Sequence, residues 1–179
     1  MRKGKFILET LGALVLGMLI AKLVVPMFLI LGHVPSESMV PTLNVGDKLI
    51  CTNAFWHNLE YGDIVVFKPN KELNDDNSLW IKRLIGLPGD KIKIEHGKVF
   101  RNGTELNESY VQGNLDYNGS FVIPEDRYFV LGDNREESLD ARFWENPFIN
   151  VKQIKYVANL RVFPFTEIEN FTPKDVNTK

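Results

Sequence analysis

A serine held between two prolines is the first feature of this sequence that could do covalent chemistry. Ser38 lies in the stretch Val34-Pro35-Ser36-Glu37-Ser38-Met39-Val40-Pro41-Thr42-Leu43. Because each proline fixes its own φ at about −65°, the loop between Pro35 and Pro41 has few conformations and can hold a hydroxyl in place. Covalent hydrolysis of a peptide bond needs such a nucleophile, a base that deprotonates it, and donors for the oxyanion. Two hydrogen-bonded serines in an ordinary turn are the alternative interpretation.

A lysine on an apolar strand is the second such feature. In the stretch Leu79-Trp80-Ile81-Lys82-Arg83-Leu84-Ile85, alternation places Lys82 on the same face as Trp80 and Leu84. Burial lowers the pKa of a lysine and leaves a neutral amine that can act as a base near neutral pH. An amine that extends along apolar neighbours into solvent is the alternative.

Histidine is the usual base of a serine protease, but the three histidines are poorer candidates. His33 follows the apolar N-terminal segment, His57 lies in a polar loop, and His96 precedes a glycine in a turn. None of these settings predicts an imidazole supported by a buried aspartate, so all three are interpreted as surface residues.

A loop dense with charges of both signs follows a strand at residues 130–142, which read Val-Leu-Gly-Asp-Asn-Arg-Glu-Glu-Ser-Leu-Asp-Ala-Arg. On its own this segment is compatible with a solvated turn or a cation site. It is equally compatible with an internal ion-pair network of Asp133, Arg135, Asp140 and Arg142 that stiffens the loop.

The composition limits the classes of function. The chain has 179 residues and a net charge of −2, so no basic field indicates nucleic-acid binding. The single cysteine, Cys51, lies in an apolar run and is expected in the core. No Cys/His cluster has the spacing of a zinc site, so we expect neither metal nor cofactor.

A basic start followed by a long apolar stretch predicts a membrane anchor. Residues 1–5 are basic, and residues 6–31 are apolar except for Glu9 and Lys22. A spanning helix needs about 20 mostly apolar residues, and basic flanks stay on the cytoplasmic side. We therefore expect a cytoplasmic tail at 1–5 and a single-pass transmembrane helix at 6–31 in the cell membrane. A cleavable secretion signal and a buried soluble helix are the alternatives.

Short strand-like runs separated by glycine, asparagine and aspartate turns follow the apolar segment. The predicted strands are 48–52, 63–68, 80–85, 91–95, 98–101, 127–131 and 153–163. They predict a mostly β domain of curved antiparallel sheets over residues 32–171, outside the cytoplasm, with a frayed tail at 172–179. Two surface loops are predicted at 71–78 and 112–120, and one short helical turn at 138–144.

Taken together, four segments resemble the ordered motifs of bacterial type I signal peptidases, the serine–lysine leader peptidases, in their short single-anchor form. The motifs are Pro-Ser-x-Ser-Met-x-Pro-Thr-Leu at 35–43, Gly-Asp-Ile-Val-Val-Phe at 62–67, Ile-Lys-Arg-Leu-Ile-Gly-Leu-Pro-Gly-Asp at 81–90, and Gly-Asp-Asn-Arg-x-x-Ser-x-Asp-x-Arg at 132–142. The resemblance covers about residues 1 to 165.

The resemblance implies a role for each matching residue. Ser38 matches the nucleophile and Lys82 the general base, while Ser36 with the Ser38 backbone N–H matches the oxyanion hole. Ser138 matches the serine that orients the lysine amine. The residues that match bracing charges are Arg83, Asp133, Asp140 and Arg142. The candidates for shallow apolar pockets that admit small side chains are Val34, Met39, Leu43, Trp80 and Ile81.

The implied activity is removal of N-terminal signal peptides from exported preproteins after small-x-small sites, with strand 79–83 pairing with the extended substrate. The sequence departs from the family pattern at Glu137, Ala141 and the segment 143–149. These departures suggest a member specialised for particular surface proteins, such as pilus subunits. A self-cleaving repressor-type protease would carry an internal Ala-Gly-like cleavage site. A non-catalytic membrane-tethered assembly factor would be expected to lose Ser38 or Lys82.

Overall fold

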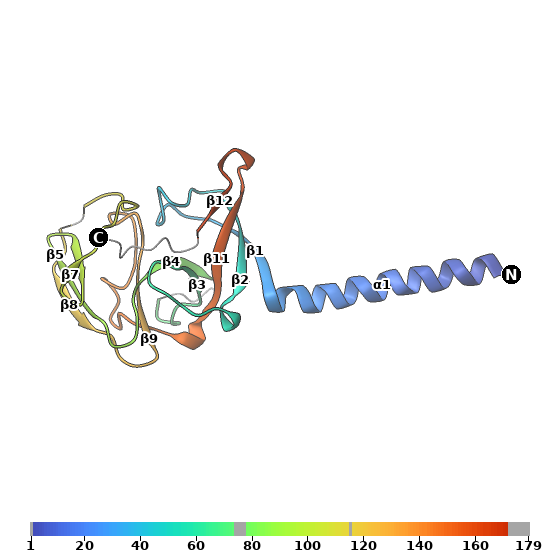
Figure 1. The fold of residues 1–179 in the computed structure, drawn as a ribbon, viewed down its shortest axis with the longest axis horizontal. Coiled ribbons are helices and arrows are strands. Elements are labelled where there is room, and N and C mark those ends of the chain that lie inside the picture. Colours follow the sequence, from blue (N-terminus) through green and yellow to red (C-terminus); the bar gives the residue numbers. More distant parts are fainter. Residues whose placement is uncertain (1, 74–77, 115, 172–179) are drawn as a thin grey trace.

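The computed structural model describes residues 2–73, 78–114 and 116–171. In these residues one long helix, α1 (Arg2–Phe28), extends away from a body built from two β-sheets (Figure 1). Within the described ranges, no helix has both the length and the hydropathy that a membrane span requires.

The predicted apolar segment ends differently from our expectation. The helix already includes residues 2–5 of the predicted tail, and it stops at Phe28, where β1 (Leu29–His33) begins. This strand pairs with β2 (Lys48–Asn53), with Ile30 opposite Cys51. The predicted boundary at residue 31 is therefore wrong, because the last apolar residues of the run belong to the sheet.

The larger sheet has the order β1-β2-β11-β3-β4-β9-β10, with β12 paired to β11, and all its pairings are antiparallel. Its further strands are β3 (Ile64–Phe67), β4 (Trp80–Gly86), β9 (Arg127–Leu131), β10 (Ile149–Asn150), β11 (Ile154–Phe163) and β12 (Glu169–Asn170). Three short 3₁₀ turns accompany it, η1 (Ala54–Trp56), η2 (Val151–Gln153) and η3 (Phe165–Glu167).

The smaller antiparallel sheet has the order β7-β6-β5-β8. Its strands are β5 (Lys91–Glu95), β6 (Lys98–Arg101), β7 (Thr104–Glu105) and β8 (Gly119–Val122). The prediction of a mostly antiparallel β fold is confirmed. The seven predicted strands are all present, because their alternating apolar residues face one of two buried clusters.

The two buried clusters support the segments that carry Ser38 and Lys82. One joins the two sheets, with Phe67 and Leu84 from the larger sheet and Ile92 and Val99 from the smaller one. The other lies under the loop that carries Ser38 and includes Met39 and Leu43. Burying a side chain of this size stabilises the fold by roughly 1.5–3 kcal/mol, so this loop is held from below by its own apolar residues.

Two local predictions are corrected by the structure. The segment 138–144 forms turns and no helix, because its aspartate and arginine side chains bind backbone groups locally. The last two residues of the predicted loop 112–120 belong to strand β8 (Gly119–Val122). At the start of this loop, Gln112 forms an isolated parallel β-bridge with Asn134. The predicted loop at 71–78 is described only in part, and the predicted tail at 172–179 lies outside the described residues.

Candidate active site

The structure brings Ser38 and Lys82 together although 44 positions separate them. The Lys82 amine donates a hydrogen bond of 2.7 Å to the Ser38 hydroxyl, and the two residues are 5% and 6% exposed. Lys82 comes from β4, opposite Val65 of β3, and its amine lies 5.9 Å from the centre of the Trp80 ring. An apolar strand therefore delivers an amine to the hydroxyl of the proline-bounded loop.

The setting of this amine changes its chemistry. Burial lowers the pKa of Lys82 from 10.5 to about 8, although the carboxylates of Asp140 and Asp133 act in the opposite direction. A lysine with this pKa has a substantial neutral fraction at mildly alkaline pH, and a neutral amine accepts a proton from a hydroxyl within hydrogen-bond reach.

The two other serines predicted for the site lie at different depths. Ser36 is exposed, with its hydroxyl oxygen 3.4 Å from that of Ser38. Ser138 is buried, and its hydroxyl has no hydrogen-bond partner among the described residues. The hydrogen bond to Lys82 that the resemblance implies for Ser138 is therefore not present. Ser138 instead packs on Gly132, where an added Cβ would collide with the Ser138 hydroxyl oxygen.

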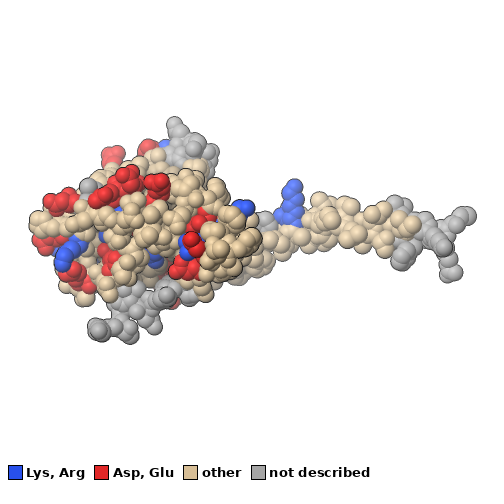
Figure 2. All heavy atoms as spheres, turned by 90° about the horizontal axis from the view of Figure 1, so that it is seen from above, with Lys and Arg blue, Asp and Glu red and all other residues tan. Residues whose placement is uncertain are grey.

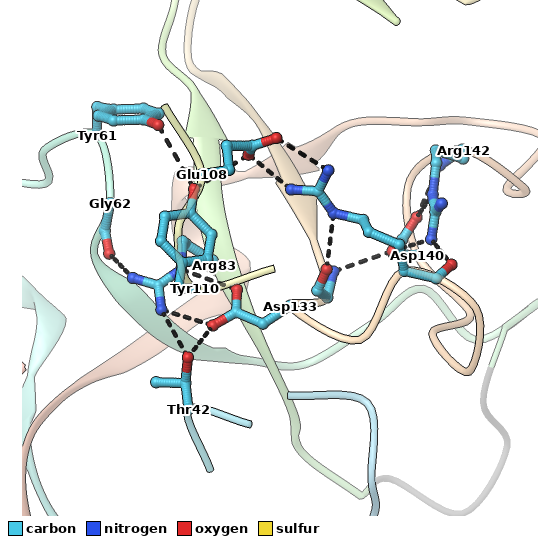
Figure 3. Close-up of polar contacts among 11 residues, drawn as sticks. Thr42, Tyr61, Gly62, Arg83, Glu108, Tyr110, Asp133, Asp140 and Arg142 are labelled. Atoms are coloured by element: carbon cyan, nitrogen blue, oxygen red, sulfur yellow. Dashed lines mark hydrogen bonds and ion pairs between the residues drawn. The ribbon is translucent and has the colours of Figure 1, made fainter. Parts of the chain in front are cut away.

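The predicted charged residues form two buried ion pairs, Arg83 with Asp133 and Arg142 with Asp140 (Figure 3). Arg83 binds both carboxylate oxygens of Asp133, at 2.8 and 2.6 Å, and donates to the carbonyl of Gly62. Thr42 donates to the same carboxylate, so this pair joins β4 to the end of the Ser38 loop. Arg142 binds Asp140 through two nitrogens, at 2.8 and 2.9 Å.

Asp140 also accepts a hydrogen bond of 2.9 Å from the Gly132 backbone. This bond connects the start of the loop after β9 to its later part. Gly132 also lies against the Ser38 carbonyl, because a Cβ added to Gly132 would lie only 2.5 Å from that oxygen. Of the interpretations left open for segment 130–142, the ion-pair network is observed in part. Asp140 pairs with Arg142 inside the segment. Asp133 and Arg135 pair outside it, with Arg83 and Glu108. No group of His, Cys, Asp and Glu in the described ranges could hold a metal ion.

An open groove of about 510 Å³ passes the Ser38–Lys82 pair. Its apolar walls come from Leu79, Trp80, Ile81 and Leu139. A smaller hollow of about 130 Å³ adjoins it, shares Leu79 and Ile81, and reaches Cys51. Cys51 is buried, as predicted, and burial raises the pKa of its thiol to about 11.

The predicted pocket residues divide into two groups. Trp80 and Ile81 line the groove. Val34, Met39 and Leu43 are at most 1% exposed and belong to the cluster beneath the Ser38 loop. The prediction that these three line the pocket is corrected, because their apolar side chains gain more by complete burial than by lining an open surface.

Comparison with known proteins places this site in a family. Residues 7–163 match the family described as signal peptidase, peptidase S26. The chain belongs to this family. It is 36% identical to signal peptidase IB of Staphylococcus aureus, over 98% of this chain and 96% of that protein. The signal peptidase family comprises serine endopeptidases, and the chain is one of them.

Two further relatives agree with this assignment. The chain is 38% identical to signal peptidase I of Leptolyngbya laminosa, over 79% of this chain and 72% of that protein. It is 42% identical to probable signal peptidase I-2 of Synechocystis, over 76% of this chain and 64% of that protein.

Sequence reasoning missed several contacts of this signal peptidase family member. His57 does contact a buried aspartate, Asp63, at 3.2 Å, which our interpretation of the histidines had excluded. Glu108 and Tyr110 were not singled out, yet Glu108 binds Arg135 and the Tyr110 ring lies 4.0 Å from the Arg83 guanidinium carbon. No local pattern marks either residue, because their partners are distant in sequence.

Proposed function

We propose that this chain removes N-terminal signal peptides from exported preproteins, with Ser38 as nucleophile and neutral Lys82 as general base. The observation that carries the proposal is the 2.7 Å contact between two buried side chains. The lowered pKa of Lys82, about 8, supports the role of base, since only the neutral amine can take a proton.

The proposed reaction proceeds through an ester on Ser38. Lys82 takes the hydroxyl proton as the oxygen bonds to the scissile carbonyl carbon, and the carbonyl electron pair moves to its oxygen. The Ser36 hydroxyl and the Ser38 backbone N–H donate to this oxyanion. The C–N bond then breaks, and the leaving amine takes the proton from Lys82. Lys82 then takes a proton from a water molecule as the water oxygen bonds to the ester carbon. The bond from that carbon to the Ser38 oxygen breaks, Lys82 returns the proton to this oxygen, and the signal peptide leaves with a free carboxylate.

The groove supports binding of an extended peptide. Residues 80–82 of β4 pair with β3 on one side, whereas pairing with β9 starts only at Arg83. Among the described residues, the backbone of 80–82 therefore has no strand partner on its other edge, which suits addition of a substrate strand. The hollow of about 130 Å³ next to Ile81 has room for a small side chain, in keeping with substrates cut after small-x-small sites.

The charged residues are proposed to brace this site without reacting. Arg83 and Asp133 hold β4 against the Ser38 loop, while Asp140 and Arg142 hold the loop after β9. Ser138 is proposed to orient the Lys82 amine once substrate is bound. Its buried hydroxyl, unpartnered among the described residues, supports this role.

We further propose that α1, which covers residues 6–28 of the predicted anchor, holds the body in the cell membrane, with the N-terminus in the cytoplasm. Apolar side chains along α1, such as those of Leu19 and Leu23, are exposed, and the helix extends away from the β body (Figure 1). The chain should remain with the membrane fraction after an alkaline carbonate wash. Release by that wash would exclude a spanning anchor.

The altered segment 143–149 supports the proposed specialisation for particular surface proteins. Trp144 packs on Trp80 with ring centres 6.1 Å apart, so this segment supports a wall of the groove. Trp144→Leu should change relative rates among signal peptides of different surface proteins. Unchanged relative rates would remove this support.

The proposed activity is tested with a signal-bearing preprotein and the full chain in detergent. Ser38→Ala and Lys82→Ala should each reduce kcat by about 10³-fold or more, because nucleophile and base act as a unit. Ser120→Ala and Lys91→Ala make the same chemical changes at exposed positions of the small sheet and should cleave like the parent. Parental rates in the first two variants would refute the proposed mechanism.

A further inference from the structure

A segment that leaves the small sheet crosses to the catalytic loop of the large sheet. We name residues 108–114 the strap, because they connect β7 to β8 while contacting the loop 132–136 that follows β9. The strap backbone meets this loop twice, with Gln112 donating to the Asp133 carbonyl at 2.9 Å and accepting from the Arg135 N–H at 2.8 Å. At its end, Asn114 donates to the Glu136 carboxylate at 3.0 Å.

Glu108 fixes the other end of the strap through an ion pair whose side chains are largely buried. Its two carboxylate oxygens accept hydrogen bonds from Arg135 at 3.0 and 2.6 Å, and the two side chains are 9% and 4% exposed (Figure 3). Tyr110 donates to the same carboxylate at 3.0 Å and lays its ring over the guanidinium of Arg83. Buried, bidentate charge-assisted contacts of this kind define geometry as well as contributing stability.

The loop that the strap holds is in turn the support of the nucleophile. Arg135 donates to the Gly132 carbonyl at 3.0 Å. Asn134 donates its backbone N–H to the Ser38 carbonyl and its side-chain amide to the Glu37 carbonyl, each at 3.2 Å. A continuous set of contacts therefore runs from Glu108 through Arg135 and Asn134 to Ser38.

We propose that Glu108 is a positioning residue, which keeps Ser38 in register with Lys82 through Arg135 and the loop 132–136. The inference rests on the proposed roles of Ser38 and Lys82 and extends the site to a segment outside its motifs. A positioned nucleophile matters because a misplacement of about 1 Å costs on the order of 10²-fold in rate.

The test compares two glutamates of the same region. Glu108→Gln keeps size and one acceptor oxygen but removes the charge and one contact to Arg135. Glu105→Gln makes the same change in an exposed ion pair with Lys98 on the neighbouring hairpin. With the full chain, at a temperature where circular dichroism shows each variant folded, Glu108→Gln should lower kcat by about 10-fold and leave KM within about 2-fold. Glu105→Gln should change neither.

The route through the loop is tested by combination with Asn134→Ala. If Glu108 acts through Asn134, the two losses in kcat are less than multiplicative in the double variant, whereas independent effects on folding would multiply. Parental kcat in Glu108→Gln, or multiplicative losses, would overturn the proposal.

A second readout needs no cleavage. Amide hydrogen exchange in residues 132–136 should accelerate in Glu108→Gln and stay parental in Glu105→Gln. If the parent chain cleaves no preprotein, the proposed function fails while this measurement still decides whether the strap holds the loop. Unchanged exchange in Glu108→Gln would show that the strap does not hold the loop 132–136 in place.

Discussion

The Lys82 amine sets the expected pH dependence of cleavage. Its pKa of about 8 means that protonation removes the base as the pH falls through that value. The rate should therefore rise about tenfold per pH unit well below pH 8 and level off above it. Initial rates on a signal-bearing preprotein between pH 5 and 10 check this. A plateau that begins near pH 6 would indicate a histidine-like base and contradict the role of Lys82.

The same burial should make Lys82 costly for stability. Its pKa is 10.5 when unfolded and about 8 when folded, so between these values the unfolded chain binds more protons. The buried charge therefore lowers the free energy of unfolding by its full amount below pH 8. This penalty disappears as the pH rises towards 10.5, and it amounts to about 3 kcal/mol.

Lys82→Met removes the buried charge and keeps an unbranched side chain. The variant should be inactive but unfold at higher urea concentration than the parent at pH 7, and this advantage should shrink as the pH approaches 10. A parent that is the more stable of the two at pH 7 would show that the amine is better satisfied by its surroundings than its burial indicates.

At the scale of elements, the Arg83–Asp133 pair connects β4, the loop after β9 and the end of the Ser38 loop. Asp133→Asn keeps the shape but leaves a buried guanidinium without its charge partner, which typically costs roughly 3–5 kcal/mol. Urea unfolding should show this loss. Glu95→Gln, in the exposed pair with Lys93, is the matched control and should leave the midpoint unchanged. Equal midpoints for parent and Asp133→Asn would mean that solvent reaches Arg83.

The strands were predictable because their signal is local. Residues 98–101 form β6 as predicted, and 80–85 form most of β4, since alternation and turn residues lie within a few positions. β1 was missed because Leu29–His33 continues the apolar run of α1 without a break. Its strand conformation depends on pairing with β2, which lies about twenty positions further along the chain and which no local pattern reveals.

The site was predictable only where a motif marks it. Ser38 and Lys82 meet as the motifs imply, although their roles remain a proposal. Burial of Met39 and Leu43 follows from packing in three dimensions, and the contact of Glu108 with Arg135 spans 27 positions. Such contacts leave no periodic trace in a single sequence.

The whole molecule is asymmetric in its exposed surface. Acidic side chains are spread over the β body, whereas the described part of α1 forms a largely uncharged stem (Figure 2). Phe55 and Trp56, 81% and 63% exposed, lie next to the helix end, since Trp56 stacks on Phe28 and donates to the Met27 carbonyl. The turn between β11 and β12 lies at the same end of the body and carries Phe165, 78% exposed (Figure 1).

Aromatic side chains at the end of a membrane helix commonly lie at the level of the lipid headgroups. If α1 anchors the chain, this end of the body should therefore touch the bilayer. A tryptophan introduced by Phe165→Trp, in a Trp56→Phe background, should be quenched by phosphatidylcholine vesicles with brominated acyl chains. Val122→Trp in the same background is the control, because Val122 is 65% exposed on β8 at the opposite end. Equal quenching at the two positions, or none at residue 165, would place the body away from the lipid surface and leave α1 as its only attachment.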